Sequence, residues 1–271
     1  MKPQAYTTLA ENEKEGWYYR ARIRMVSTLV ERFIQPQRPD LNILDVGCGT
    51  GGTSMALTRF GNVLGVEPSD LALKLLKKNY PELRVVQGDT QRLPHLVPRA
   101  SFDLATIMGV LVSRAVPDPL AALKNVATAV KPGGWIIWNE ATYPLLTRQH
   151  DDFVDVERRF YPSQMRKYLE ESGFEVRHAS HVLGWGFAPA LALALVYRLK
   201  RWLFRIEDPS EEADTSDDRP LPDFLNRLLG GLTYLEWSAS LKGIKAPLGV
   251  AYLAIAQKKT IAEPAADRKA A

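Results

Sequence analysis

The sequence predicts a doubly wound α/β fold, in which a mostly parallel sheet of seven strands carries helices on both faces. Two observations lead to this prediction. Short apolar segments alternate with segments of helical periodicity through the first half of the chain, and a glycine-rich turn joins the first of these apolar segments to the next helix. Strands that alternate with helices form parallel sheets with right-handed crossovers.

Composition sets the limits of the interpretation. The 271 residues are 46% apolar and 24% charged, as in an ordinary soluble protein with one sizeable core. The single cysteine, Cys48, excludes an internal disulfide and fits a reducing compartment. No apolar segment follows Met1, so a secretory signal is not expected and the cytoplasm is the predicted location. The net charge of +4 is too small to indicate DNA as a partner.

Periodicity and breaking residues predict the elements in order. The first helix should run from Glu11 to Phe33, where apolar residues recur near a 3.6-residue period, and prolines 36 and 39 end it. The expected strands are Leu41–Val46, Asn62–Val66, Leu83–Val86, Phe102–Met108, Trp135–Trp138, Phe174–Ala179 and Leu248–Ala256. The expected helices between them are Thr53–Phe60, Asp70–Asn79, Pro119–Val130, which Lys131-Pro132-Gly133-Gly134 should stop, and Pro162–Ser172.

A helical insert is expected before the last strand. Residues 1–180 and 247–259 should form the α/β domain, residues 181–246 a helical cap, and residues 260–271 a flexible tail. The cap should hold one helix from Pro189 to about Ile206 and a second from Leu221 to Leu241. Between them, the acidic run 207–214 reads as an exposed loop.

The most informative motif is Leu-Asp-Val-Gly-Cys-Gly-Thr-Gly-Gly, which spans residues 44–52 between a strand and a helix. Glycines at 47, 49 and 51 let the backbone turn tightly and approach a ligand without an intervening Cβ. Gly47, Gly49 and Gly52 also match the dinucleotide fingerprint. Asp45, two residues before the first glycine, would repel a pyrophosphate and suits a ligand that carries an ammonium and a sulfonium.

This motif resembles the first motif of class I S-adenosylmethionine-dependent methyltransferases, and the resemblance continues in order from about Trp17 to Trp138. It implies a Rossmann-like methyltransferase fold with S-adenosylmethionine as the cofactor. Within the family pattern, Glu67 ends the second strand and would accept both ribose hydroxyls, as in dinucleotide folds. Asp89 follows the third strand and would receive the adenine amino group, with Thr90 beside it. The donor-binding residues expected from the motif are Asp45, Gly47, Gly49, Gly51, Glu67, Asp89 and Thr90.

The segment Gly-Trp-Tyr-Tyr-Arg-Ala-Arg at residues 16–22 resembles a helix that many family members lay over the donor. Tyr18 or Arg22 would then contact the methionine carboxylate, since arginine binds carboxylates through two hydrogen bonds. The alternative is an amphipathic packing helix with aromatic anchors. The sequence leaves both open.

Acceptor chemistry is less visible. Methyl transfer from a sulfonium mainly requires positioning, and a base is needed only where the acceptor loses a proton. The tetrapeptide of base-amino methylases is missing after Thr106–Met108, and Ser113-Arg114 stand where many small-molecule relatives have a histidine. Glu140, at the end of the fifth strand, is the catalytic candidate, with Tyr143 a weaker one. The four histidines have no metal-ligand spacing, so no metal is expected.

Residues 182–197 carry no charge, but glycines and Pro189 interrupt them, and the stretch is short for a membrane span. In the following helix, 189–206, Leu195, Leu199 and Trp202 share a face that Arg198 and Arg201 flank. This pattern fits peripheral membrane contact, and it also fits the commoner case of a helix packed on the core with a solvated basic side.

We therefore expect methyl transfer to a small-molecule acceptor, with a lipid-like or lipid-linked one among the candidates. The segment Leu-Asn-Arg-Leu-Leu at residues 225–229, with the later Glu236 and Pro247, resembles bacterial methyltransferases of cell-surface glycan or lipid-linked biosynthesis. A protein or RNA methyltransferase, or a catalytically inactive S-adenosylmethionine-binding protein, remain the alternatives. The oligomeric state is not predicted.

Overall fold

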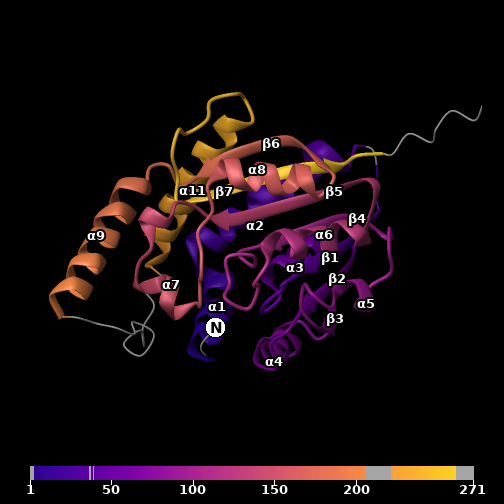
Figure 1. The fold of residues 1–271 in the computed structure, drawn as a ribbon, viewed down its shortest axis with the longest axis horizontal. Helices are drawn as coiled ribbons and strands as arrows, with labels where there is room; N and C mark the ends of the chain where they lie inside the picture. The colour runs from indigo at the N-terminus through magenta and orange to yellow at the C-terminus, as the bar shows by residue number, and fades with distance from the viewer. Residues whose placement is uncertain (1–2, 37, 39, 205–220, 261–271) are drawn as a thin grey trace, which may run out of the picture.

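The computed structural model describes residues 3–36, 38, 40–204 and 221–260, and contains one seven-stranded sheet with helices on both faces (Figure 1). The strands are ordered β3-β2-β1-β4-β5-β7-β6, and only β7 runs antiparallel to its neighbours among them. Their bounds are β1 (Leu41–Val46), β2 (Gly61–Glu67), β3 (Arg84–Gln87), β4 (Phe102–Met108), β5 (Val130–Ala141), β6 (Phe174–Val182) and β7 (Ala251–Lys258). The predicted fold class is confirmed.

The helices are distributed along the whole chain. Those of the first half are α1 (Pro3–Glu15), α2 (Trp17–Leu29), the π-helical turn η1 (Val30–Ile34), α3 (Gly52–Leu57), the 3-10 turn η2 (Thr58–Phe60), α4 (Asp70–Asn79), α5 (Leu93–Leu96) and α6 (Pro119–Ala129). Those of the second half are η3 (Pro144–Leu146), α7 (Gln149–Phe153), α8 (Pro162–Glu171), α9 (Phe187–Phe204) and α11 (Asp223–Ser240).

Alternation along the strands divides the core into two layers. In β5, Ile136 and Trp138 pack with α6 and α8 on one face, while Trp135 and Ile137 pack with α2 and α11 on the other. Successive side chains of a strand point to opposite faces, so a strand buried on both sides is apolar throughout. This explains why the central strands read as short continuous apolar runs.

Several expected boundaries were wrong. The single helix from Glu11 to Phe33 is two helices, α1 and α2, which meet at Gly16. Gly16 is extended (φ −68°, ψ 128°), and a Cβ there would lie 2.7 Å from the carbonyl oxygen of Asn12. The chain can therefore bend back on itself only where that Cβ is missing.

The helix α6 ends at Ala129, just before residues 131–134 as expected, but the following strand was expected to start at Trp135 and residues 131–134 already belong to β5. Against β4 the register shifts from Phe102 opposite Val130 to Leu104 opposite Trp135, so residues 131–134 form a bulge inside a longer strand. The last strand likewise begins at Ala251 rather than Leu248. The acidic run 207–214 and the tail from residue 261 onward lie outside the described residues.

The large side chains of α9 do not pack on the core. Leu195, Leu199 and Trp202, which the packed-helix interpretation placed against the sheet, are all more than half exposed. That interpretation is therefore wrong for the described part of this helix. No described helix is both long enough and apolar enough to cross a membrane.

The sheet order reverses between β1 and β4. From β1 the chain proceeds outward through β2 to β3, and then returns to place β4 on the other side of β1. Ligands of open α/β sheets bind at such switch points, beyond the carboxyl ends of the strands.

Candidate donor and acceptor site

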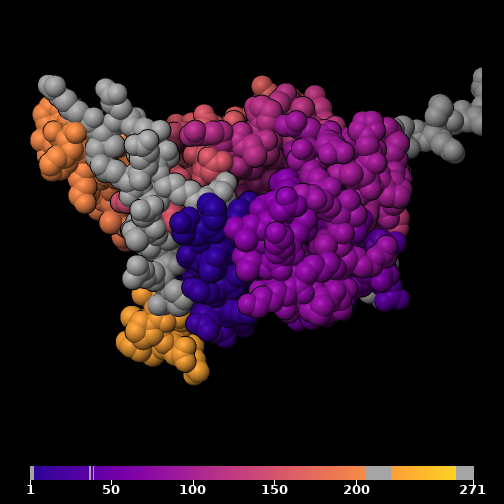
Figure 2. Space-filling model, turned by 90° about the horizontal axis from the view of Figure 1, so that it is seen from below, coloured from indigo at the N-terminus to yellow at the C-terminus, as the bar shows by residue number. Residues whose placement is uncertain are grey.

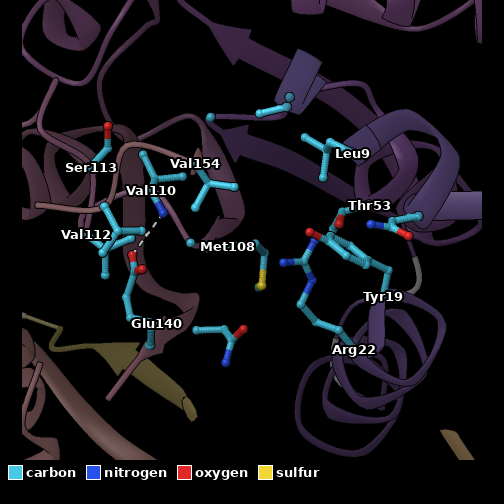
Figure 3. A pocket seen from close by; sticks show the side chains of 18 of the residues that line it. Leu9, Tyr19, Arg22, Thr53, Met108, Val110, Val112, Ser113, Glu140 and Val154 are labelled. Atoms are coloured by element: carbon cyan, nitrogen blue, oxygen red, sulfur yellow. Dashed lines mark hydrogen bonds between the residues drawn. The ribbon is translucent and has the colours of Figure 1, made fainter. Parts of the chain in front are cut away.

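A cavity of about 450 Å³ opens at the carboxyl ends of the sheet strands, and α1 and α2 form its cover (Figure 3). Its wall contains all but one of the predicted donor residues, and Glu140 as well. Gly51 is the exception: it caps α3, and a Cβ there would meet Leu76 of α4, away from the cavity. Because the strand order is β3-β2-β1-β4-β5, the residues at successive strand ends follow one another along the cavity.

The glycine turn brings β1 and the end of β4 into contact. Gly47 has φ +68°, and a Cβ there would lie only 2.4 Å from Cγ2 of Val110. Gly47 N and Cys48 N both donate to Val66 O, at 2.7 and 3.2 Å. Gly49 N donates to Glu67 Oε2 at 3.0 Å.

These hydrogen bonds distinguish the turn from a phosphate-binding loop. A pyrophosphate site needs backbone N–H groups that point to the anion. Here the N–H groups of residues 47, 48 and 49 are engaged by protein oxygens, and that of Gly52 donates to Glu13 Oε2 at 2.9 Å. Buried carboxylates also line the cavity, so the site disfavours an anionic diphosphate.

Asp45 is one of these buried carboxylates, at 1% exposed. Its oxygens accept from Ser54 Oγ at 2.6 Å and Thr106 Oγ1 at 2.7 Å. Burial raises the pKa of Asp45, and those hydroxyls and Arg22 oppose the rise. Asp45 therefore holds α3 and β4 around the turn, in addition to facing the cavity.

Glu67 is the last residue of β2, and Asp89 lies in the segment after β3. Both oxygens of Glu67 accept backbone N–H groups, from Gly49 and from Ser69, each at 3.0 Å. Asp89 Oδ1 accepts from Gln91 N at 2.9 Å and Arg92 N at 2.8 Å, which fixes the loop that carries Thr90. These bonds orient the two carboxyl groups before any ligand binds.

Buried polar atoms on the cavity wall that have no hydrogen-bond partner among the described residues include Thr90 Oγ1, Arg22 Nε and Glu140 Oε2. Leaving a buried polar group unpaired costs about 1–3 kcal/mol, so such atoms indicate where a ligand completes the site. They occur beside β3, above β1 and at β5, and so span the length of the cavity. The buried carboxylates, the Arg22 guanidinium and the Thr90 hydroxyl together fit S-adenosylmethionine, because that molecule carries ribose hydroxyls, an ammonium and a carboxylate.

Arg22 comes from the middle of α2 and is buried. Its guanidinium lies over the ring of Tyr19, 4.8 Å from the centroid, and no described carboxylate forms an ion pair with it. Tyr18 OH donates to Asn139 Oδ1 at 3.2 Å, which ties α2 to the end of β5. In Figure 3, Arg22 and Glu140 lie on either side of Met108.

Only one carboxylate oxygen of Glu140 accepts hydrogen bonds from the described residues. Its Oε1 accepts from Leu111 N at 2.8 Å, Trp138 Nε1 at 3.0 Å and Val110 N at 3.1 Å. Burial raises the pKa of Glu140 to about 7 despite these donors. The arrangement leaves Oε2 to act on whatever enters the cavity near the end of β4.

Another part of the cavity wall is mainly apolar. Its side chains come from the loop after β4, from α7 and the residues after it, and from the start of β7: Val110, Val112, Val116, Phe153, Val154, Val156 and Val250. The buried pair Arg159–Asp151, with 2.8 Å between Nη2 and Oδ1, also lines the cavity. Tyr143, the weaker catalytic candidate, instead contacts His181 Nε2 through its hydroxyl at 2.8 Å, and does not line the cavity.

Sequence patterns missed Glu13 and the α7 segment. Glu13 Oε2 accepts from Thr50 Oγ1 at 2.5 Å and from Gly52 N, so α1 is fastened to the glycine turn. A lone glutamate in a polar helix gives no signal of such a contact. Among the described residues, no group of three or more His, Cys, Asp and Glu side chains is arranged to hold a metal ion.

Comparison with known proteins agrees with this geometry. Residues 43–134 match the family model described as a methyltransferase domain. Ubiquinone biosynthesis O-methyltransferase of Albidiferax ferrireducens is 29% identical over 158 residues, which cover 50% of this chain and 60% of that protein. Demethylmenaquinone methyltransferase of Staphylococcus aureus is 36% identical over 116 residues, covering 40% of this chain and 46% of the relative. In both cases the chain spans less than two thirds of the relative's length.

Solved structures share the fold at low identity. The [4+2]-cyclase SpnF has a TM-score of 0.55 at 18% identity, covering 88% of this chain and 81% of its own. A SAM-dependent methyltransferase from Archaeoglobus fulgidus has a TM-score of 0.51 at 16% identity, covering 87% and 94%. Residues 43–134 are therefore a methyltransferase domain, and the sheet order and the solved structures agree with the S-adenosylmethionine-dependent methyltransferase fold.

Proposed function

We propose that this chain transfers a methyl group from S-adenosylmethionine to an apolar small molecule of the lipid-quinone class. One observation carries the proposal: a single cavity is lined by the polar donor residues along one part of its wall and by apolar side chains along another, and Glu140 belongs to the same wall. The two relatives named for ubiquinone biosynthesis and for demethylmenaquinone support this acceptor class.

Each donor residue has a proposed partner. Glu67 accepts the ribose hydroxyls, and Thr90 Oγ1 with Asp89 contacts the adenine. Arg22, which forms no ion pair with a described carboxylate, binds the methionine carboxylate. Asp45, beside the glycine turn, favours the positively charged ammonium and sulfonium through its negative charge.

When bound, S-adenosylmethionine supplies a methyl group on a positively charged sulfur, and an acceptor oxygen, nitrogen or carbon displaces that sulfur in line. Glu140 Oε2 takes the proton that the acceptor loses. Its pKa of about 7 is suited to this task, because a base is most effective when its pKa lies near the working pH. The apolar wall holds the acceptor and excludes water from the transfer.

The test is incubation of the chain with methyl-labelled S-adenosylmethionine and a bacterial extract, followed by partition between organic and aqueous phases. We expect label in the organic phase, and less label from Arg22→Met than from the matched variant Arg20→Met, whose arginine is exposed on the same helix. Label in small aqueous molecules would contradict the lipid class. Label in precipitated protein or RNA would favour a macromolecular acceptor, and donor binding without any transfer would favour an inactive binding protein.

A further inference from the structure

α9 presents large apolar side chains to solvent along its length. Trp202 is 76% exposed and Phe204 is 73% exposed. We call the exposed apolar residues of this helix the α9 patch: Leu193, Leu195, Val196, Leu199, Trp202, Leu203 and Phe204. Soluble proteins rarely expose a contiguous set of this kind unless it binds something.

The inner side of the helix is made of small residues. Ala190 and Ala194 are the residues that α9 buries. Polar bonds hold it to the body instead: Tyr197 OH donates to Asp152 of α7, and Arg198 Nη2 donates to the carbonyl oxygens of Pro144 and Leu145 at 3.0 and 2.9 Å. The orientation is therefore opposite to that of a helix whose apolar face packs on a core.

The position of α9 agrees with an outward role. It stands at the edge of the molecule, away from the helices that cover the sheet (Figure 1), and projects from one corner in the space-filling view (Figure 2). It touches η3 and lies beside α7, whose residues His150, Asp151 and Phe153 line the apolar part of the cavity wall.

Charge decides which partner the patch fits. The helix contains Arg198, Lys200 and Arg201 and no acidic residue. A helix with Trp, Phe and Leu on one side and basic residues at the flanks is typical of the interface of an anionic membrane. A second copy of the chain fits less well, because symmetric pairing through α9 would bring these like charges together.

We infer that α9 docks this protein on the surface of an anionic lipid bilayer, with the α9 patch inserted at the level of the headgroups. On the proposed function, this docking sets the apolar part of the cavity wall next to the lipid phase from which the acceptor comes. The docking itself does not depend on that function.

The experiment is flotation of the purified full chain with vesicles of phosphatidylcholine containing phosphatidylglycerol. We expect the wild-type chain to float, and Leu199→Asp/Trp202→Asp to lose about ten-fold or more in partition coefficient. The control is Ile244→Asp, which introduces one aspartate at a 72% exposed apolar residue in the loop after α11. Equal loss in this control, or no flotation of the wild-type chain, would overturn the assignment of α9.

A charge series tests the lipid chemistry separately. Each basic residue near an anionic surface is worth about five-fold, so Lys200→Gln/Arg201→Gln should lose about twenty-fold at low salt. Lys74→Gln/Lys78→Gln on α4 removes the same charge from a distant exposed helix and should change little. Equal binding to vesicles without phosphatidylglycerol would contradict the role of the basic flank.

Sedimentation tests the competing occupant. A wild-type dimer that Leu199→Asp/Trp202→Asp dissociates would assign the patch to a second copy of the chain and overturn the proposal. Calorimetric binding of S-adenosylmethionine to the same variants keeps the two proposals apart. A docking variant that binds the donor normally but does not float supports membrane docking whether or not methyl transfer is ever observed.

Discussion

At the scale of single residues, Thr90 offers the cleanest separation of binding from folding. The residue is buried, at 4% exposed, and its hydroxyl has no hydrogen-bond partner within the part of the chain that the structure describes. Thr90→Val should therefore leave the free energy of unfolding unchanged or raise it, because it removes an unpaired buried polar group. If the hydroxyl contacts the donor, the variant should bind S-adenosylmethionine up to about ten-fold more weakly by calorimetry.

The control for this prediction is Thr106→Val. Thr106 Oγ1 is equally buried but donates to Asp45 at 2.7 Å. Its loss should lower the free energy of unfolding by about 1–3 kcal/mol in urea denaturation. Unchanged donor affinity in Thr90→Val would remove Thr90 from the binding site.

Glu140 predicts a pH profile. Since the base must be deprotonated and its pKa is about 7, kcat/KM should rise with pH up to about 7 and level off above it. Glu140→Gln keeps an oxygen for Leu111 N and Trp138 Nε1 but cannot take a proton, so we expect a loss of about 10²–10⁴-fold in kcat and no inflection near pH 7. A profile that keeps the inflection in Glu140→Gln would assign it to another group.

The same group affects stability in a defined direction. Burial raises the pKa of Glu140 above its usual value near 4.5, so the folded chain holds a proton that the unfolded chain has released between these pH values. The contribution is present below about pH 4.5 and is lost as pH rises through 7. Glu140→Gln should consequently gain stability relative to wild type between pH 5 and pH 8, measured by urea denaturation. A constant difference across that range would contradict the raised pKa.

At the scale of elements, the β1–α3 turn can be tested with a matched pair of glycines. Gly47 (φ +68°) and Gly109 (φ +76°) both occupy the left-handed region, but only at Gly47 would a Cβ meet a neighbour, Val110, at 2.4 Å. Gly109→Ala should cost about 1–2 kcal/mol from backbone strain alone. Gly47→Ala should cost about 1–3 kcal/mol more, because the side chain must displace the end of β4. Equal costs in thermal or urea unfolding would show that β1 and β4 are not held this closely.

Much of the element pattern could be predicted, since local signals define it. Asp70–Asn79 has a serine cap whose side chain accepts from Ala72 N, and Phe102–Met108 is a buried, mostly apolar strand; both were predicted with their observed bounds. The failures have non-local causes. Residues 131–134 end α6 as expected but also form a bulge in β5 opposite β4, and Gly16 breaks a continuous helical pattern because a Cβ there would meet the carbonyl oxygen of Asn12.

The residues of the site divide in the same way, into those that a local sequence signal predicted and those that depend on tertiary packing. Asp45, Glu67 and Asp89 could be placed from sequence, because each follows a strand and the parallel order puts strand ends together. Gly51 is adjacent to the other glycines in sequence, yet the turn directs it toward α4. No local pattern indicates that Glu13 reaches the turn from α1, or that α9 directs its large side chains outward, since both depend on tertiary packing.

At the scale of the whole molecule, donor binding joins parts that are far apart in sequence. The cavity wall includes residues of α1 and α2, of the ends of β1, β2, β4 and β5, and of the start of β7, so a ligand there should stabilise the folded chain as a unit. At a donor concentration one hundred times Kd, the expected gain is about 2.7 kcal/mol, visible as a rise in Tm. A Tm that does not depend on donor concentration would contradict a binding site built from these elements.

The most direct test of the central claim is a calorimetric titration of the wild-type chain with S-adenosylmethionine, and separately with NAD. Because the N–H groups of the glycine turn are engaged and carboxylates line the cavity, we predict saturable binding of S-adenosylmethionine and none of NAD. Arg22→Met should weaken that binding about 10–100-fold, while Arg20→Met leaves it unchanged. Saturable binding of NAD without binding of S-adenosylmethionine would contradict the account.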